Sequence, residues 1–118
     1  MTRSSAVIVR TGIIVLTIAT ALIHFRQALL FPTPDPLFIL NGLGYLGLLA
    51  ALYLPIPQLS GHKRIIRFAL IGFTALTFAL FFIITGGVGA SIAYIDKAIE
   101  AVLIVLLVVE ARAESRRA

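Results

Sequence analysis

Four long apolar segments, separated by short runs that contain proline or glycine, constrain the fold of this chain more than any other feature. The segments cover about residues 6–31, 36–54, 63–85 and 91–111. At about 1.5 Å of rise per residue, a helix of about 20 residues crosses a hydrocarbon layer of about 30 Å. Each segment is therefore long enough to form a membrane-spanning helix, and the chain is predicted to be all-α.

The breaks between the segments support this number of helices. Prolines in the run 32–36 exclude a helix interior there, and Asp35 followed by Pro36 is a typical helix start. The run 55–57 ends the second segment, and the glycines in 86–89 end the third. Because the connections are short, we expect consecutive helices to be antiparallel, in an up-down four-helix bundle that makes residues 1–118 a single transmembrane domain.

The composition excludes several classes of protein. Hydrophobic residues make up 60% of the chain and charged residues 13%, with a mean hydropathy of +1.08. Soluble domains are about 45–50% apolar and about 25% charged, so an ordinary soluble enzyme, a disordered chain and a coiled coil are excluded. The chain has no cysteine, which removes disulfides, thiolate nucleophiles and cysteine-ligated metals. We therefore predict an integral membrane protein without enzymatic activity.

The basic residues indicate how the helices are oriented. The chain has ten lysines and arginines against five acidic residues, an excess that in a soluble protein would raise the question of a nucleic-acid partner. Here all but Arg26 and Lys97 lie in the stretches 3–10, 63–67 and 112–117, which share one side of a four-helix bundle. The positive-inside rule predicts that both termini are cytoplasmic. We expect a multi-pass protein of the cell (inner) membrane, with the lipid bilayer as partner and no nucleic acid.

Polar residues inside the apolar segments are the candidate functional residues, because charges are costly in a bilayer. A residue count from the cytoplasmic ends places one group of them about 21–24 Å from the inner surface: His24, Arg26, Asn41 and Asp96. The same count places Tyr45 and Glu100 about 15 Å from that surface, near the middle of the bilayer. The predicted site thus lies in the outer half of the membrane.

The last segment carries the two acidic residues of this site. Asp96 and Glu100 are four residues apart and share one helix face, and Lys97 can also reach Glu100. In one interpretation Glu100 binds a proton or cation, Asp96 attracts cations at the outer mouth, and Arg26 and Lys97 set the resting charge. In a second, the same charges neutralise one another and only fix the register of the helices. In a third, they contact a partner subunit.

A bound metal would require His24, Asp96 and Glu100 to come together. Arg26 and Lys97 are cations that would compete with a metal ion for the carboxylates, so we predict no metal site. Nothing in the sequence calls for another cofactor.

The second segment contains three glycines in the spacing G-x-G-x-x-G, at Gly42, Gly44 and Gly47. This spacing indicates dinucleotide binding only between a strand and a helix, and here it lies inside an apolar helix. Small residues in a membrane helix let a neighbouring helix approach closely, so these glycines are predicted to be packing residues. The same groove could accept a lipid tail or an isoprenoid.

In size and helix number the chain resembles two groups of small four-helix membrane proteins, the small multidrug-resistance transporters and the fluoride channels. The transporters carry a glutamate in the first helix, where this chain has no acidic residue. The channels carry a polar, phenylalanine-rich segment in the third helix, which residues 77–82 do not reproduce. Both groups are known for inverted pairing of subunits, which the charge bias here opposes. No family is assigned on these residues.

Two functions follow from the sequence as hypotheses. The first is an oligomeric channel or transporter for protons or cations, and it needs a homo-oligomer because one copy has few polar residues with which to line a path. The second is an accessory structural subunit that packs against other membrane subunits. A lipid- or quinone-binding membrane protein is a weaker third hypothesis.

Overall fold

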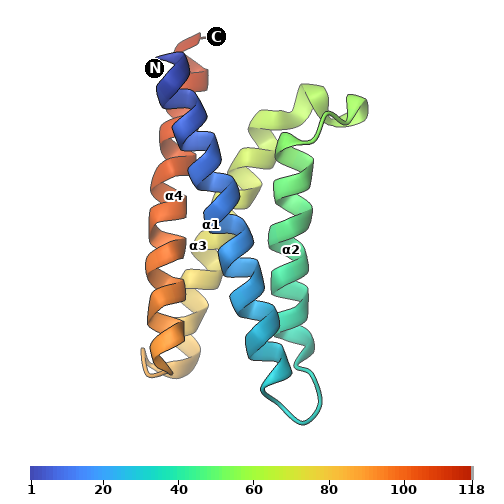
Figure 1. Cartoon of the computed structure of the whole chain (residues 1–118), viewed down its shortest axis with the longest axis vertical. Coiled ribbons are helices and arrows are strands. Elements are labelled where there is room, and N and C mark those ends of the chain that lie inside the picture. The colour runs from blue at the N-terminus through green and yellow to red at the C-terminus, as the bar shows by residue number, and fades with distance from the viewer. Residues whose placement is uncertain (118) are drawn as a thin grey trace.

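The computed structural model describes residues 1–117 and contains four long helices (Figure 1). In chain order the elements are α1 (Arg3–Leu29), α2 (Pro36–Tyr53), the short 3-10 helix η1 (Pro57–His62), α3 (Lys63–Thr85) and α4 (Ser91–Arg117). Residues 1–117 contain no β-strand. The predicted all-α class and the four helices are confirmed, whereas η1 was not predicted.

The helix ends follow the local chemistry of the sequence. The Asp35 side chain accepts a hydrogen bond of 2.8 Å from the backbone N–H of Leu37, and Pro36 is the first residue of α2, as predicted. Gly86 ends α3 with a φ of 67°, a left-handed conformation that glycine adopts without strain. Helix α1 begins earlier than predicted because the Thr2 side chain caps it by accepting from the N–H of Ser5.

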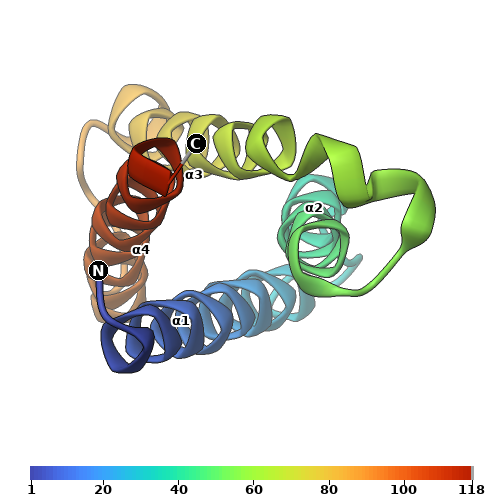
Figure 2. The ribbon, with the colours of Figure 1, turned by 90° about the horizontal axis from the view of Figure 1, so that it is seen from above.

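The helices form a ring in which each one packs against its neighbours in the sequence and α4 closes back onto α1 (Figure 2). Their directions alternate, so the N- and C-termini lie at the same end of the molecule (Figure 1). We call this the terminal end, and the opposite end, with the α1–α2 and α3–α4 connections, the loop end. The predicted up-down arrangement is thus observed, in a molecule of 47 × 27 × 22 Å.

Three stretches are long and apolar enough to cross a membrane: Arg3–Leu29, Pro36–Tyr53 and Pro57–Thr85, which joins η1 to α3. The fourth helix is long enough but carries Asp96, Lys97 and Glu100 inside its apolar part. It also continues beyond residue 111, the predicted end, to Arg117. The prediction of four apolar spans therefore holds for three of the helices.

The distribution of residues is the reverse of that in a water-soluble bundle. Charged and hydroxyl side chains of α1, α3 and α4 are buried, including Thr17, Thr74 and Glu100, each with an exposed fraction of 0%. Large apolar side chains cover the outer surface, such as Ile8 at 70% and Ile83 at 75% exposed. Extensive exposed apolar surface of this kind marks contact with a membrane or with other proteins.

A layer of apolar side chains fills the middle of the bundle. All four helices contribute to this layer, which we call the apolar layer: Ile13, Leu49, Leu70, Leu103 and Leu107, all at most 8% exposed. The hydroxyl groups of the nearby Thr17 and Thr74 bond to the carbonyl oxygens of Ile13 and Leu70 in their own helices. Their polarity is thus satisfied locally, and they add no polar path between the helices.

Candidate functional site

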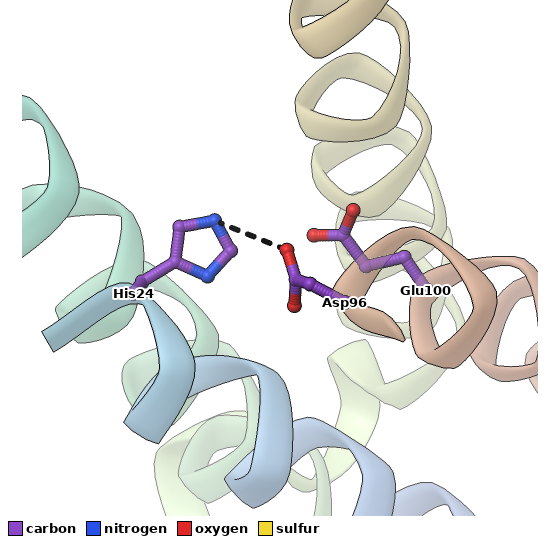
Figure 3. Close-up of side chains that lie close together, drawn as sticks. All are labelled: His24, Asp96 and Glu100. Atoms are coloured by element: carbon purple, nitrogen blue, oxygen red, sulfur yellow. Dashed lines mark ion pairs between the residues drawn. The ribbon is translucent and has the colours of Figure 1, made fainter. Parts of the chain in front are cut away.

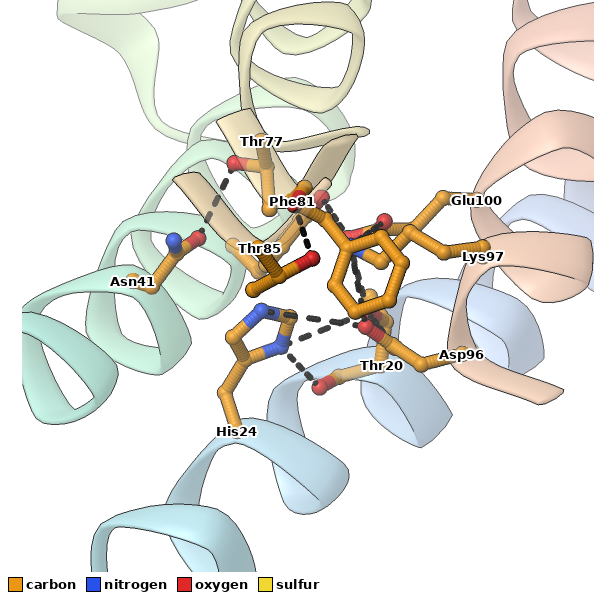
Figure 4. A network of polar contacts seen from close by, with 10 residues as sticks. Thr20, His24, Asn41, Thr77, Phe81, Thr85, Asp96, Lys97 and Glu100 are labelled. Carbon is orange, nitrogen blue, oxygen red and sulfur yellow. Dashed lines mark hydrogen bonds and ion pairs between the residues drawn. The ribbon is translucent and has the colours of Figure 1, made fainter. Parts of the chain in front are cut away.

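Polar side chains from α1, α2 and α4 meet on the loop-end side of the apolar layer. Figures 3 and 4 show those of α1 and α4. They are four ionisable residues and two hydroxyl-bearing residues, which we call the ionisable cluster: His24, Asp96, Lys97, Glu100, Thr20 and Tyr45. Each of the six is at most 7% exposed. The structure therefore brings together the two predicted acidic residues and three of the five predicted supporting residues.

Helical spacing explains why these side chains meet. Residues four apart on a helix share a face, which pairs Thr20 with His24 on α1 and Asp96 with Glu100 on α4. Lys97 lies three residues before Glu100, and its ammonium forms an ion pair with that carboxylate. The two helices pack side by side, so their two polar faces form a single buried cluster.

Glu100 is the most enclosed member of the ionisable cluster, with an exposed fraction of 0%. Its Oε2 accepts a hydrogen bond of 2.7 Å from the hydroxyl of Tyr45, and its Oε1 contacts the Lys97 ammonium. The predicted common level of Tyr45 and Glu100 is confirmed by this direct contact. Both carboxylate oxygens are occupied by donors, as a buried carboxylate requires.

Asp96 lies between Glu100 and the loop end. Its Oδ1 accepts a hydrogen bond of 2.5 Å from the hydroxyl of Thr20, and its Oδ2 lies 3.4 Å from Nζ of Lys97. The Thr20 hydroxyl also lies 3.3 Å from Oε2 of Glu100. Because a hydroxyl donates only one hydrogen, the shorter contact assigns the hydrogen of Thr20 to Asp96.

The orientation of His24 leaves one ring nitrogen facing a carboxylate. Its Nδ1 lies 2.7 Å from the carbonyl oxygen of Thr20, which can only accept, so Nδ1 carries a hydrogen. Its Nε2 lies 3.8 Å from Oδ2 of Asp96 (Figure 3). In the neutral ring this nitrogen presents a lone pair to the carboxylate, and a proton or cation between the two atoms would replace that repulsion with attraction.

The formal charges of the ionisable cluster do not cancel. Asp96 and Glu100 contribute two negative charges, and Lys97 contributes one positive charge. With His24 neutral, the cluster carries one excess negative charge, on side chains that are all at most 7% exposed. One bound proton or one monovalent cation would balance this excess.

Arg26 does not supply the missing positive charge. It is exposed on the outer face of α1, and none of the ion pairs among the described residues includes it. The expectation that Arg26 neutralises a carboxylate is therefore wrong in this arrangement. Two residues along a helix correspond to a rotation of about 200°, which turns Arg26 away from the face that carries His24.

A cavity of about 280 Å³ adjoins the ionisable cluster at the loop end. Its polar lining includes His24, Asp96 and Lys97, and its apolar lining includes the rings of Phe38 and Phe81. Residues of the α3–α4 connection also line it, so it reaches the loop end of the bundle. Glu100 is not part of this lining and lies behind Asp96 and Lys97, at the inner limit of the polar region.

Asn41 lies on the opposite wall of this cavity. Its side-chain oxygen accepts a hydrogen bond of 3.1 Å from the hydroxyl of Thr77 on α3 (Figure 4). Asn41 is thus close to the site, as its predicted level implies, but it lines the cavity and does not bond to the carboxylates.

A second group of polar residues lies on the terminal-end side of the apolar layer. In this group, the terminal cluster, Arg67 of α3 pairs with Glu110 and Glu114 of α4, and the hydroxyl of Tyr53 bonds to Glu110 at 2.8 Å. The Arg10 guanidinium lies over the Tyr53 ring, 5.1 Å from its centroid. A cavity of about 390 Å³ adjoins this cluster.

The position of Arg67 in the sequence predicts membrane topology only, and the terminal cluster is a finding of the structure. A usable pattern was present, since Glu100, Leu103, Leu107, Glu110 and Glu114 follow one another at intervals of three or four residues. That spacing places all five on one face of α4. The contacts of Arg67 with the two glutamates also explain why α4 continues beyond its apolar part.

The three glycines of α2 differ in what they contact. A Cβ added at Gly42 would lie 2.8 Å from the ring of Phe25 of α1, and one at Gly44 would lie 2.5 Å from the ring of Phe73 of α3. Both glycines therefore allow close helix packing, as predicted. At Gly47 an added Cβ would meet no atom of the described residues within 4 Å, so the predicted packing role of Gly47 stays a prediction, for a helix outside the described residues.

Comparisons with known proteins add no relative to this description. No protein-family model matches the chain, and neither a curated protein nor a solved structure matches it.

Proposed function

We propose that this chain is a non-enzymatic multi-pass membrane protein that binds one proton or monovalent cation at the ionisable cluster and exchanges it with the outer side of the cell membrane. The excess negative charge of the buried cluster carries this proposal. Asp96 and Glu100 face only one lysine, and a charge left unbalanced in the interior is costly. A site of this charge is balanced when it holds one additional positive charge.

The reversed distribution of polar and apolar residues supports insertion in a membrane. Ile8 and Ile83 are mostly exposed while Glu100 is fully buried, an arrangement that is favourable when lipid surrounds the bundle. The long dimension of 47 Å exceeds the thickness of a hydrocarbon core of about 30 Å. The charged side chains inside the apolar part of α4, Asp96, Lys97 and Glu100, are buried, so this helix can cross the lipid with the other three.

The positive-inside rule supports a cytoplasmic location for both termini. Arg3, Arg10, Arg64 and Arg112 all belong to stretches at the terminal end of the bundle. In this orientation the cavity next to His24 and Asp96 opens to the outer side. A cation would enter through that cavity and meet Asp96 before Glu100.

The apolar layer supports a transporter in preference to an open channel. Glu100 and Glu110, on either side of the layer, are ten residues apart on α4, a separation of about 15 Å. Leu103 and Leu107 fill this interval and are fully buried. Passage to the terminal cluster therefore requires a rearrangement of the helices, while exchange at the loop end does not.

Measurement of flux in proteoliposomes tests the proposal. The purified chain is reconstituted, and proton or Na⁺ uptake is followed with a fluorescent indicator under an imposed membrane potential. Glu100→Gln removes one negative charge and is expected to reduce uptake at least about tenfold, because the additional positive charge is no longer required. Asp35→Asn is the matched control, since it makes the same chemical change at the loop end and asparagine remains a good helix cap.

Equal uptake by the wild type and Glu100→Gln, with both variants folded, would contradict the proposed site. Uptake that also falls in Asp35→Asn would show that the effect is not specific to the ionisable cluster. Absence of uptake by the wild type with every cation tested would contradict transport itself.

An accessory subunit of a larger membrane complex remains the second candidate function. The observation that favours it is that every fully enclosed side-chain nitrogen and oxygen atom of the described residues has a hydrogen-bond partner, as in a network that only fixes helix register. The outward-facing Gly47 offers space for a helix of a second copy or another subunit. Extraction of the native particle in mild detergent distinguishes the two functions, since an accessory subunit is recovered with other polypeptides and a transporter alone or as a homo-oligomer.

A further inference from the structure

Lys97 places its ammonium group close to both carboxylates of the ionisable cluster. Its ammonium pairs with Glu100 and lies 3.4 Å from Oδ2 of Asp96. The side chain is buried, and its Nζ lies 5.5 Å from the centroid of the Phe81 ring, whose face also attracts a cation. The ionisable cluster thus contains a cation of its own, the ammonium group of Lys97.

The groups around this ammonium form a potential ligand set for a metal ion. His24, Asp96 and Glu100 each offer one ligand atom, and these three atoms lie within 4.8 Å of one another (Figure 3). One imidazole and two carboxylates suit divalent transition metals such as Zn²⁺ and Co²⁺. The adjoining cavity provides a route of entry for an ion.

The positive charge of Lys97 opposes the binding of a divalent metal ion by these three ligands. With Lys97 in place, a divalent ion would bring the positive charge to three against two negative charges. A monovalent cation or a proton brings it to two, which balances the carboxylates. The ammonium would also lie within a few ångströms of the metal, where two cations in a medium of low dielectric repel each other strongly.

We propose that Lys97 is the specificity-determining residue of the site and that its ammonium excludes divalent metal ions from the His24–Asp96–Glu100 ligand set. The identity of the monovalent cargo rests on the proposed function. The exclusion of divalent ions is a property of the folded cluster and is measurable at equilibrium without transport.

Titration of the detergent-purified protein with Co²⁺ tests this role. Lys97→Met keeps a side chain of similar length and removes the charge, and we expect it to bind one Co²⁺ per chain at least about 100-fold more tightly than the wild type. Binding is expected to produce the visible absorption bands of Co²⁺ held by one nitrogen and carboxylate oxygens. Lys97→Arg retains the charge and should exclude Co²⁺ as the wild type does.

A second substitution tests whether the proposed ligands bind the Co²⁺ ion. His24→Phe introduced together with Lys97→Met removes the nitrogen ligand, and both the tight binding and the visible bands should disappear. Lys97→Gln is used in place of Lys97→Met if the methionine variant lacks the helical circular dichroism of the wild type. Failure of both variants to fold would overturn the proposal, because Lys97 would then be a structural counter-ion.

Equal Co²⁺ affinity of the wild type and Lys97→Met, whether tight or weak, would also overturn the proposal. This result is separable from failure of the proposed function. If the wild type shows no flux but Lys97→Met gains the Co²⁺ site, only transport is contradicted. If the wild type transports a cation but Lys97→Met gains no site, only the selective role of Lys97 is contradicted.

Discussion

The hydroxyl of Tyr45 donates a hydrogen bond to Glu100, whose carboxylate is fully buried. It reaches Glu100 from α2, whereas the other donors to that carboxylate, Lys97 and Thr20, come from α4 and α1. Since the hydrogen of Thr20 is directed to Asp96 at 2.5 Å, Tyr45 is the effective donor to Oε2. Among the described residues, Tyr45 is therefore the α2 side chain that hydrogen-bonds to a carboxylate of the ionisable cluster.

Tyr45→Phe is expected to lower the free energy of unfolding by about 1–3 kcal/mol, because it leaves one oxygen of a buried carboxylate without its principal donor. Thermal unfolding in detergent, followed by circular dichroism, measures the change. Tyr94→Phe is the control, since the Tyr94 hydroxyl bonds to the carbonyl oxygen of Gly87 at an exposed position. A change of less than about 0.5 kcal/mol is expected there, and equal changes at the two tyrosines would contradict the role of Tyr45.

At the scale of the elements, α2 is positioned by contacts where its glycines face α1 and α3. Gly44 lies against the ring of Phe73, and that ring packs edge-on against Tyr45 with centroids 4.8 Å apart at 87°. The approach of α2 to α3 therefore determines the position of Tyr45 and, through it, the contact with Glu100. Packing between helices and the geometry of the site are coupled at this point.

Alanine substitutions at two glycines of α2 distinguish the effect of helix packing on the free energy of unfolding from the effect of helix propensity. Both Gly44→Ala and Gly47→Ala favour the helix by about 1 kcal/mol, but only the former places a methyl group against Phe73. We expect Gly44→Ala to lower the free energy of unfolding by about 1–3 kcal/mol and Gly47→Ala to leave it unchanged or raise it. The same unfolding measurement applies, and equal effects would show that Gly44 is not a packing residue.

Hydrophobic segment length and proline placement were sufficient to predict the helices, and residue counting was sufficient to predict which polar groups share a level. Depth along a helix does not determine the direction in which a side chain points. Arg26 therefore lies outside the cluster although it is only two residues from His24, and Gly47 lies on the outer face of α2. The terminal cluster does not follow from the basic residues of the sequence, because the pairing of Arg67 with Glu110 depends on how α3 packs against α4.

At the scale of the whole molecule, all exposed positions at one end are expected to lie on the same side of the membrane. Because the sequence contains no cysteine, single cysteines can report this directly. In intact cells, an impermeant maleimide is expected to label Val88→Cys at the loop end and to leave Gly61→Cys at the terminal end unlabelled until the membrane is permeabilised. The opposite labelling pattern would reverse the proposed orientation, and labelling of both positions in intact cells would contradict a single orientation.

The two cavities and the apolar layer between them have an electrical consequence. Where water fills both cavities, the low-dielectric barrier of the molecule is shortened from the full hydrocarbon thickness of about 30 Å to about the 20 Å between Lys97 and Glu110, which line the two cavities. Most of the transmembrane voltage then falls across the leucines of α4. A unit charge that crosses this interval gains or loses about 2.3 kcal/mol of electrostatic energy per 100 mV of membrane potential. The free energy of a helix movement that carries a charge across the interval would therefore depend on the membrane voltage.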